Sequence, residues 1–193
     1  MKEENKMSKE RIYRSISEMR TSGKTISGVA CVVESWSKDL GGFKELIKRE
    51  ALTEELINKS DVMLNVDHNP EKVLARSKFG KGSLRLFITE RGLEFTTEAP
   101  DTQLGRDVLV MLERGDYSQC SFCFSLGEGS DYWYQDSTGQ LCREIKNFDK
   151  LYDVSIVYDP AYDATQVDAR STSLVAVFTH LNELEKEINS III

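Results

Sequence analysis

No run of apolar residues in this 193-residue chain approaches the roughly 20 residues that a helix needs to span a bilayer. The first segment, Met1 to Arg11, is polar and charged and lacks the apolar stretch of a secretory signal peptide. Both absences predict a protein that neither crosses nor binds a membrane and that folds in a cytoplasm.

A block of charge of one sign is also absent. Thirty-two acidic residues against 25 basic ones give a net charge of −7, and the two signs are mixed along the chain. A protein that binds nucleic acid by neutralising phosphates needs a basic surface. The composition therefore argues against a nucleic-acid partner.

Several motifs of common enzymes are missing. The chain has no HExxH, no GxSxG and no glycine-rich turn leading into a helix. Cys120 and Cys123 have C-x-x-C spacing, and Cys31 and Cys142 would complete four zinc ligands. On a strand, however, residues three apart point to opposite faces, and no second C-x-x-C occurs. We expect free thiols, no metal and no cofactor.

The chain does contain many short segments with strand character, separated by turn residues. We expect about eight to ten short strands and two or three helices, which predicts a mainly β fold, a closed or nearly closed barrel with peripheral helices. The predicted strands span 25–34, 43–46, 62–68, 73–76, 83–88, 93–98, 117–125, 132–134, 140–148 and 151–158, with the three from 73 to 98 forming a meander. The predicted helices span 52–59 and 101–114.

This pattern divides the chain into three parts. Residues 1–24 are expected to be an N-terminal arm, disordered in part, and residues 25–165 the barrel domain. In residues 166–193, a linker leads into apolar residues at helical spacing from Leu174 to Ile188, which predicts an amphipathic C-terminal helix.

The segment 117–125 carries the first candidate functional residue. Alternation along a strand places Cys120, Phe122 and Phe124 on one face and Ser121 and Cys123, with Ser125, on the other. A bulky apolar face opposite a face of small groups suits a strand that lies between a core and a cleft. Ser121 would then present its hydroxyl to the cleft, although an ordinary small residue on a sheet surface fits the same pattern.

Histidine is scarce, since the chain holds only His68 and His180. His68 ends the strand 62–68 before the turn Asn69-Pro70, and alternation places it on the side of Val62, Leu64 and Val66. His180 falls in the predicted C-terminal helix. If the protein uses a histidine base, that base is His68; the alternative is a histidine in a surface turn.

The late strand 151–158 carries an acidic residue, Asp153, among apolar neighbours. A carboxylate there is unfavourable unless it is paired or hydrogen-bonded, so Asp153 is the most informative acidic residue of the chain. Asp149, shortly before the strand, is the competing candidate.

From Ile26 to Ala164 the chain resembles the prohead maturation proteases of tailed bacteriophages, which are serine peptidases with a herpesvirus assemblin-like barrel. The resemblance rests on five stretches in order: 26–47 (ISGVACVVESWSKDLGGFKELI), 62–77 (VMLNVDHNPEKVLARS), 82–108 (GSLRLFITERGLEFTTEAPDTQLGRDV), 114–124 (RGDYSQCSFCF) and 151–162 (LYDVSIVYDPAY).

The resemblance implies a role for each candidate. Ser121 corresponds to the nucleophile of a small-Ser-Phe-x-Phe strand, His68 to the general base, and Asp153 to the acidic group that orients the histidine. The family more often has Glu at the place of Asp153 and Gly at the place of Cys123. The oxyanion-hole donors are not fixed by the resemblance; Arg76 and the backbone near the late strand are candidates.

The implied function is a serine endopeptidase that cleaves scaffold protein, or the scaffolding segment of the major capsid protein, inside the procapsid in the host cytoplasm, and that also cleaves itself. The C-terminal helix then has two interpretations, a targeting tail or packing on the barrel. The sequence leaves open whether the protein forms a homo-oligomer. Two rival classes are a catalytically silent barrel that acts as an assembly partner and a cysteine hydrolase that uses Cys120 or Cys123.

Overall fold

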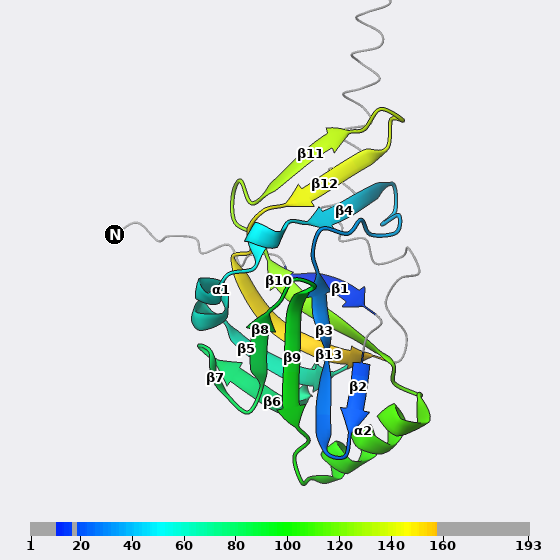
Figure 1. Ribbon diagram of the computed structural model, residues 1–193, viewed down its shortest axis with the longest axis vertical. Coiled ribbons are helices and arrows are strands. Elements are labelled where there is room, and N and C mark those ends of the chain that lie inside the picture. Colours follow the sequence, from blue (N-terminus) through cyan, green and yellow to red (C-terminus); the bar gives the residue numbers. More distant parts are fainter. Residues whose placement is uncertain (1–10, 17–18, 158–193) are drawn as a thin grey trace, which may run out of the picture.

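The computed structural model describes residues 11–16 and 19–157 (Figure 1). The predicted C-terminal helix in residues 166–193, the boundary at residue 165 and His180 lie outside the described residues. None of the helices within the described ranges is long and apolar enough to cross a membrane.

The largest sheet has six strands and carries the candidate residues. Its order is β1 (Ile12–Ile16), β10 (Gln119–Ser125), β13 (Lys150–Val157), β5 (Asp61–Val66), β6 (Asn69–Lys78) and β7 (Lys81–Gly82). β13 and β5 run parallel, and the other neighbours are antiparallel. Strands far apart in the sequence, β1 and β10, therefore lie side by side.

Two smaller sheets complete the fold. An antiparallel sheet has the order β2 (Met19–Ser22), β3 (Thr25–Val32), β9 (Gly92–Glu98) and β8 (Arg85–Ile88). A three-stranded sheet consists of β11 (Asp131–Gln135), β12 (Leu141–Ile145) and β4 (Phe43–Ile47), and we call it the small sheet. The helices are a 3-10 turn (Arg49–Ala51), α1 (Glu54–Lys59) and α2 (Gln103–Arg114). Among the described residues, the small sheet and α2 lie at opposite ends (Figure 1).

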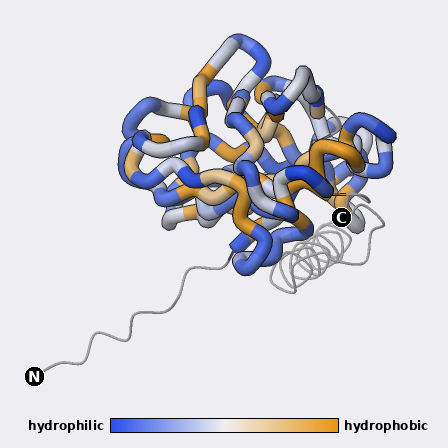
Figure 2. The backbone as a smooth tube through the Cα atoms, turned by 90° about the horizontal axis from the view of Figure 1, so that it is seen from below, coloured by the Kyte–Doolittle hydropathy of each residue, from blue (hydrophilic) through white to orange (hydrophobic). Residues whose placement is uncertain are grey.

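One apolar cluster joins the six-stranded and four-stranded sheets. Phe122, Leu64 and Ile156 of the first sheet are buried together with Ile26 and Phe95 of the second. Each such side chain contributes about 1.5–3 kcal/mol when it is fully buried. Hydrophobic and hydrophilic residues alternate along much of the chain (Figure 2), as expected of strands with one face on this core.

The mainly β class is confirmed, and most predicted strands are present. The segment 25–34 forms β3, and the segment 151–158 forms β13. The predicted meander of residues 73–98 is correct only for its last two strands: β8 and β9 pair antiparallel in the four-stranded sheet, whereas β6 belongs to the six-stranded one. A run of strands close in sequence does not reveal that the chain changes sheets between them. Within the part of the chain that the structure describes, the ladders form three sheets, and the closed barrel stays a prediction.

The predicted arm contributes strands of its own. Within residues 1–24, β1 pairs with β10, and β2 pairs with β3 across the predicted boundary at residue 24. The strand next to Ser121 is thus supplied by the start of the chain.

Candidate active site

Ser121 lies in the middle of β10, the second strand of the six-stranded sheet. The chain leaves α2 through Gly115, whose φ of 80° is readily adopted only by glycine, and enters β10 a few residues later. The predicted core face of Cys120, Phe122 and Phe124 is buried as expected. The opposite face is also buried, and Ser121 is only 2% exposed rather than open to solvent.

His68 lies in a two-residue turn rather than on a strand. Val66 pairs with Asn69, and Asp67 and His68 between them have φ values of 52° and 53°, as in a type I′ hairpin turn. Positive φ is unfavourable for residues with a side chain, so such a turn persists only when its surroundings hold it. Two hydrogen bonds to β13 hold the turn: Asp67 N donates to Ile156 O at 3.0 Å, and His68 N donates to Ser155 Oγ at 2.7 Å.

The turn also corrects the predicted direction of the imidazole. Alternation along the strand placed His68 on the side of Val66, which lies on the core face with Ile156, its partner in β13. The structure ends β5 at Val66, and the ring instead reaches the opposite face, where Ser121 and Asp153 lie.

The three candidate side chains form one hydrogen-bonded chain. His68 Nε2 lies 2.8 Å from Ser121 Oγ, and His68 Nδ1 lies 2.7 Å from Asp153 Oδ1. The register between β10 and β13 brings Ser121 and Asp153 close together, because Cys123 lies opposite Asp153 and Ser121 lies opposite Ser155. The tautomer with its proton on Nδ1 satisfies both contacts: Nδ1 donates to the carboxylate, and Nε2 accepts from the serine hydroxyl.

Burial distinguishes the members of this chain. Ser121 and Asp153 are buried, whereas the side chain of His68 keeps 23% of its surface exposed. A buried carboxylate needs a compensating donor, and the Nδ1 proton provides one. The arrangement can accept a proton from Ser121 at Nε2 and stabilise the resulting imidazolium from the other side.

The other acidic candidate lies elsewhere. Asp149 follows β12 and contacts Ser125 at the end of β10, where its backbone N donates to Ser125 O at 2.9 Å. Arg76, the suggested oxyanion-hole donor, forms a bidentate ion pair with Asp61 at the surface. Because β13 and β5 separate β6 from β10, Arg76 lies three strand spacings from Ser121, roughly 14 Å.

Two residues at the site were not predicted. Ser155 accepts the backbone hydrogen bond from His68; its position two residues after Asp153, on the same face, was the available signal. Tyr13 of β1 packs its ring against the imidazole, with centroids 4.6 Å apart and planes at 75°. No pattern in the sequence linked Tyr13 to this site.

The cysteines do not supply a reactive thiolate here. All four are buried and free of disulfides. Burial, reinforced by the nearby charge of Asp153, raises the pKa of Cys123 to about 12, and Cys120 donates from its thiol to Val29 O on the core side. Only the thiolate is a strong nucleophile, so a protonated Cys123 is a poor one at neutral pH. Among the described residues, no group of three or more His, Cys, Asp or Glu side chains is placed to hold a metal ion.

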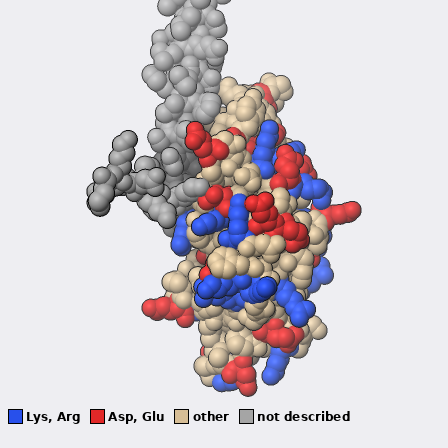
Figure 3. Space-filling view, turned by 90° about the vertical axis from the view of Figure 1, so that its left-hand side faces the viewer, with Lys and Arg blue, Asp and Glu red and all other residues tan. Residues whose placement is uncertain are grey.

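Charges on the surface are mixed. On the face shown in Figure 3, basic and acidic side chains alternate without a large area of one sign. This distribution matches the mixing of charges along the sequence.

A comparison with curated proteins found no match. The solved structure of the bacteriophage T4 capsid assembly protease is similar to 77% of this chain and 98% of that chain, with 10% identity and a TM-score of 0.49. The family model described as caudovirus prohead serine protease matches residues 11–179. The chain therefore belongs to the caudovirus prohead serine protease family.

Proposed function

We propose that this protein is an endopeptidase of prohead maturation in which Ser121 is the nucleophile, His68 the general base and Asp153 the group that orients the histidine. The observation that carries the assignment is the hydrogen-bonded chain from Ser121 Oγ through both ring nitrogens of His68 to Asp153 Oδ1. Membership of a serine protease family independently calls for such a nucleophile.

The chemistry follows from the geometry. Ser121 Oγ attacks the carbonyl carbon of the scissile peptide bond while its proton moves to His68 Nε2, so that the serine becomes nucleophilic without ever being a free alkoxide. Asp153 stabilises the imidazolium through Nδ1. The imidazolium then gives the proton to the leaving amine, and the acyl-enzyme remains on Ser121. Water, deprotonated by the same Nε2, hydrolyses the ester and restores the serine.

Two rival functions have less support than the serine endopeptidase. A silent barrel was expected to have the same three residues misaligned, whereas both contacts here lie within hydrogen-bond distance. A cysteine hydrolase would need a thiolate near the base, and burial keeps Cys123 protonated.

The proposed substrates are the capsid and scaffold proteins of the phage, and the proposed place of action is the interior of the procapsid in the host cytoplasm. Self-cleavage, an assemblin-like closed barrel and a targeting role for residues 166–193 belong to the same proposal. Support for these finer points comes from the family resemblance alone.

The experiment that tests the function is intact-mass measurement of three full-length proteins: wild type, Ser121→Ala and Ser125→Ala. Ser125 lies on the same strand and the same buried face, so Ser125→Ala controls for loss of a buried hydroxyl. Each protein is expressed alone and together with the capsid and scaffold proteins of its phage, so that assembly can occur.

We expect wild type and Ser125→Ala to trim a capsid protein, a scaffold protein or themselves. Ser121→Ala should be slower by a factor on the order of 10⁴ or more. Trimming by Ser121→Ala at the wild-type rate would refute the assignment. No trimming by wild type in either setting would favour the silent barrel.

A further inference from the structure

Tyr13 occupies the edge of the candidate site. It lies on β1, which has β10 as its ladder partner, and a single row of register runs from Tyr13 through Cys123 to Asp153. Neighbouring strands lie roughly 4.8 Å apart, so Tyr13 is two strands away from Asp153 on the same face. Its ring meets the His68 imidazole edge to face. Tyr13 therefore contacts His68, the one member of the hydrogen-bonded chain whose side chain is partly exposed.

The hydroxyl of Tyr13 stays protonated. Burial, then the neighbouring Cys123 and the charge of Asp153, raise the pKa of Tyr13 to about 12. Tyr13 is 45% exposed as a residue, yet its phenol stays neutral at any working pH. The side chain thus packs its ring against His68 and leaves its remaining surface toward solvent.

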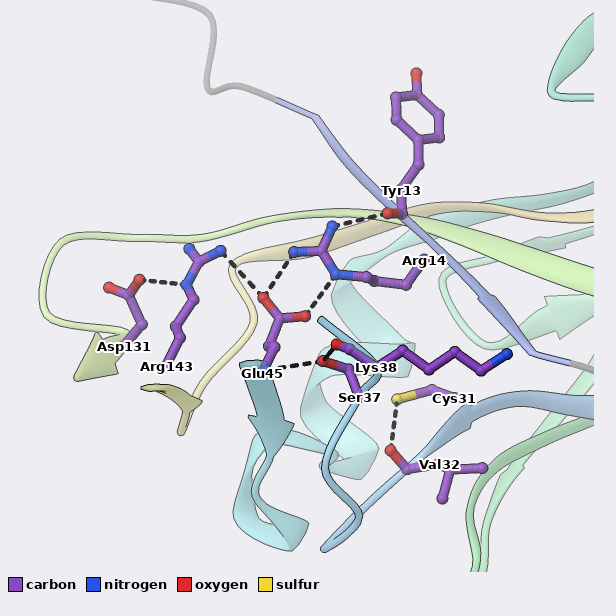
Figure 4. Close-up of polar contacts among 9 residues, drawn as sticks. All are labelled: Tyr13, Arg14, Cys31, Val32, Ser37, Lys38, Glu45, Asp131 and Arg143. Carbon is purple, nitrogen blue, oxygen red and sulfur yellow. Dashed lines mark hydrogen bonds and ion pairs between the residues drawn. The ribbon is translucent and has the colours of Figure 1, made fainter. Parts of the chain in front are cut away.

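The next residue anchors β1 from the other face of the strand. Arg14 donates from Nη1 to the Tyr13 carbonyl at 2.8 Å and binds Glu45 with two hydrogen bonds of 2.6 and 2.7 Å (Figure 4). Glu45 is buried on β4 of the small sheet and also accepts from Arg143 at 3.1 Å. Arg143 in turn donates to Asp131 at 2.7 Å. We call Arg14, Glu45, Arg143 and Asp131 the buried charge cluster.

This cluster explains how a short edge strand keeps its place. Charge-assisted, bidentate arginine–carboxylate pairs are the strongest and most directional of side-chain hydrogen bonds. Figure 4 shows Tyr13 pointing away from the cluster while Arg14 points into it. The small sheet therefore fixes β1 through Arg14, and β1 presents Tyr13 to the site.

We propose that Tyr13 is a positioning residue that holds the His68 imidazole at the angle where Nε2 meets Ser121 and Nδ1 meets Asp153. His68 needs such support because it projects from a turn and keeps an exposed side. This inference rests on the proposed function for its effect on rate, but the contact itself is independent of that function. Misplacing a catalytic group by about 1 Å is enough to slow a reaction roughly 10²-fold.

The test compares Tyr13→Phe, which keeps the ring, with Tyr13→Leu, which removes it. Tyr132→Leu is the matched control, because Tyr132 is an exposed tyrosine on β11, in the small sheet. The first readout is the imidazole Cε1–H NMR signal of the full chain in a Ser121→Ala background, which prevents self-cleavage. With only two histidines in the sequence, the signal of His68 is identified by its loss in His68→Gln.

We expect the His68 signal to move in Tyr13→Leu, through loss of the ring current, and to stay near its place in Tyr13→Phe and Tyr132→Leu. The second readout is cleavage, with Ser121 restored, of a peptide that spans the cut site mapped by intact mass. Tyr13→Leu should lower kcat by 10-fold to 100-fold with KM changed less than about threefold, and Tyr13→Phe should restore most of the rate.

The two ideas fail in different ways. A wild type that does not cleave refutes the proposed function and leaves the NMR comparison to decide the contact. A wild type that cleaves, beside a Tyr13→Leu protein with unchanged kcat or an unmoved His68 signal, overturns the positioning role. A Tyr13→Leu protein whose loss is confined to KM also overturns it, because the residue would then bind substrate instead.

Discussion

Asp153 is the residue whose environment is hardest to explain without function. Its side chain is almost fully buried on β13, between Val154 and Tyr152 in sequence, and its compensating contact is with His68. An ion or polar group in such a place is unfavourable by several kcal/mol unless a partner satisfies it. A purely structural strand gains nothing from a carboxylate there, whereas a histidine base gains its correct tautomer.

The first prediction concerns this carboxylate. Asp153→Asn should lower kcat by a factor on the order of 10²–10⁴, because an amide can hold the imidazole in the wrong tautomer. Asp149→Asn should stay within about threefold of wild type, since Asp149 contacts Ser125 rather than the proposed base. Peptide cleavage by the two variants, with unfolding curves to show that both fold, checks the prediction. A larger loss in Asp149→Asn would transfer the orienting role to that residue.

Much of the candidate site was accessible from the sequence, although in unequal ways. Ser121 and Asp153 were singled out from strand alternation and from an apolar neighbourhood, and the resemblance added their roles. His68 was chosen by scarcity, but its direction was predicted wrongly because two consecutive positive φ values are invisible in Asp67-His68. Tyr13 was missed, because its contact depends on pairing between strands more than 100 positions apart.

At the scale of elements, the hairpin turn after β5 is the feature that places His68, the proposed base. Type I′ turns usually contain Asn-Gly or Gly-Gly, because both central residues need positive φ. Asp67 tolerates this region better than most side chains, and its backbone N is held by Ile156 O. The backbone of this turn is therefore strained, and its hydrogen bonds to β13 compensate for the strain.

The second prediction follows from this strain. Asp67→Val should lower the free energy of unfolding by about 1–2 kcal/mol, because a β-branched side chain is unfavourable at a φ of 52°. Asp67→Gly should leave stability within about 1 kcal/mol of wild type, since glycine accepts positive φ but has more freedom to lose on folding. The side chain of Asp67 is exposed, so neither change alters the core. Urea unfolding of both variants measures the difference, and equal stability of the two would contradict the strained turn.

Elements were predicted well where their signal is local and poorly where it is not. The strand 25–34 and the helix 101–114 follow from β-branched runs and helical spacing, and they appear as β3 and α2. The partner of each strand does not follow from such patterns. The change of sheet between β6 and β8 depends on Leu84 N bonding to Arg76 O and on Thr97 Oγ1 bonding to Ser83 O, contacts that only the folded chain brings together.

At the scale of the whole molecule, the buried charge cluster is the link between the small sheet and the site. Burial alone would raise the pKa of Glu45, but the charges and hydrogen bonds of Arg14 and Arg143 outweigh it, and the pKa lies below its ordinary value. Both tryptophans report on the small sheet: Trp36 bridges to Leu46 of β4, and Trp133 lies on β11. Tryptophan fluorescence therefore follows this sheet, whereas far-UV circular dichroism follows all three.

The third prediction is that the cluster makes the sheets unfold together. In wild type at neutral pH, the fluorescence and circular dichroism transitions in urea should coincide, as for a two-state domain. Glu45→Gln leaves two arginines without their shared carboxylate and should destabilise the protein by about 3–5 kcal/mol. The fluorescence transition should then precede the other. Separate transitions in wild type would show that the cluster does not couple the sheets.

The fourth prediction concerns how the free energy of unfolding of wild type and of Glu45→Gln changes with pH. Because the pKa of Glu45 is depressed in the folded protein, its contribution is fully present above the ordinary glutamate pKa of about 4.3 and is lost as pH falls through the folded value. Carboxylates that do not contact the buried charge cluster have the same surroundings in wild type and Glu45→Gln, so their contributions cancel in the difference. The gap in unfolding free energy between the two proteins should therefore be constant from pH 8 to about pH 5 and shrink below about pH 4. A gap that widens with acid would mean that Glu45 is protonated in the folded state, and β1 would then be held by something other than its charge.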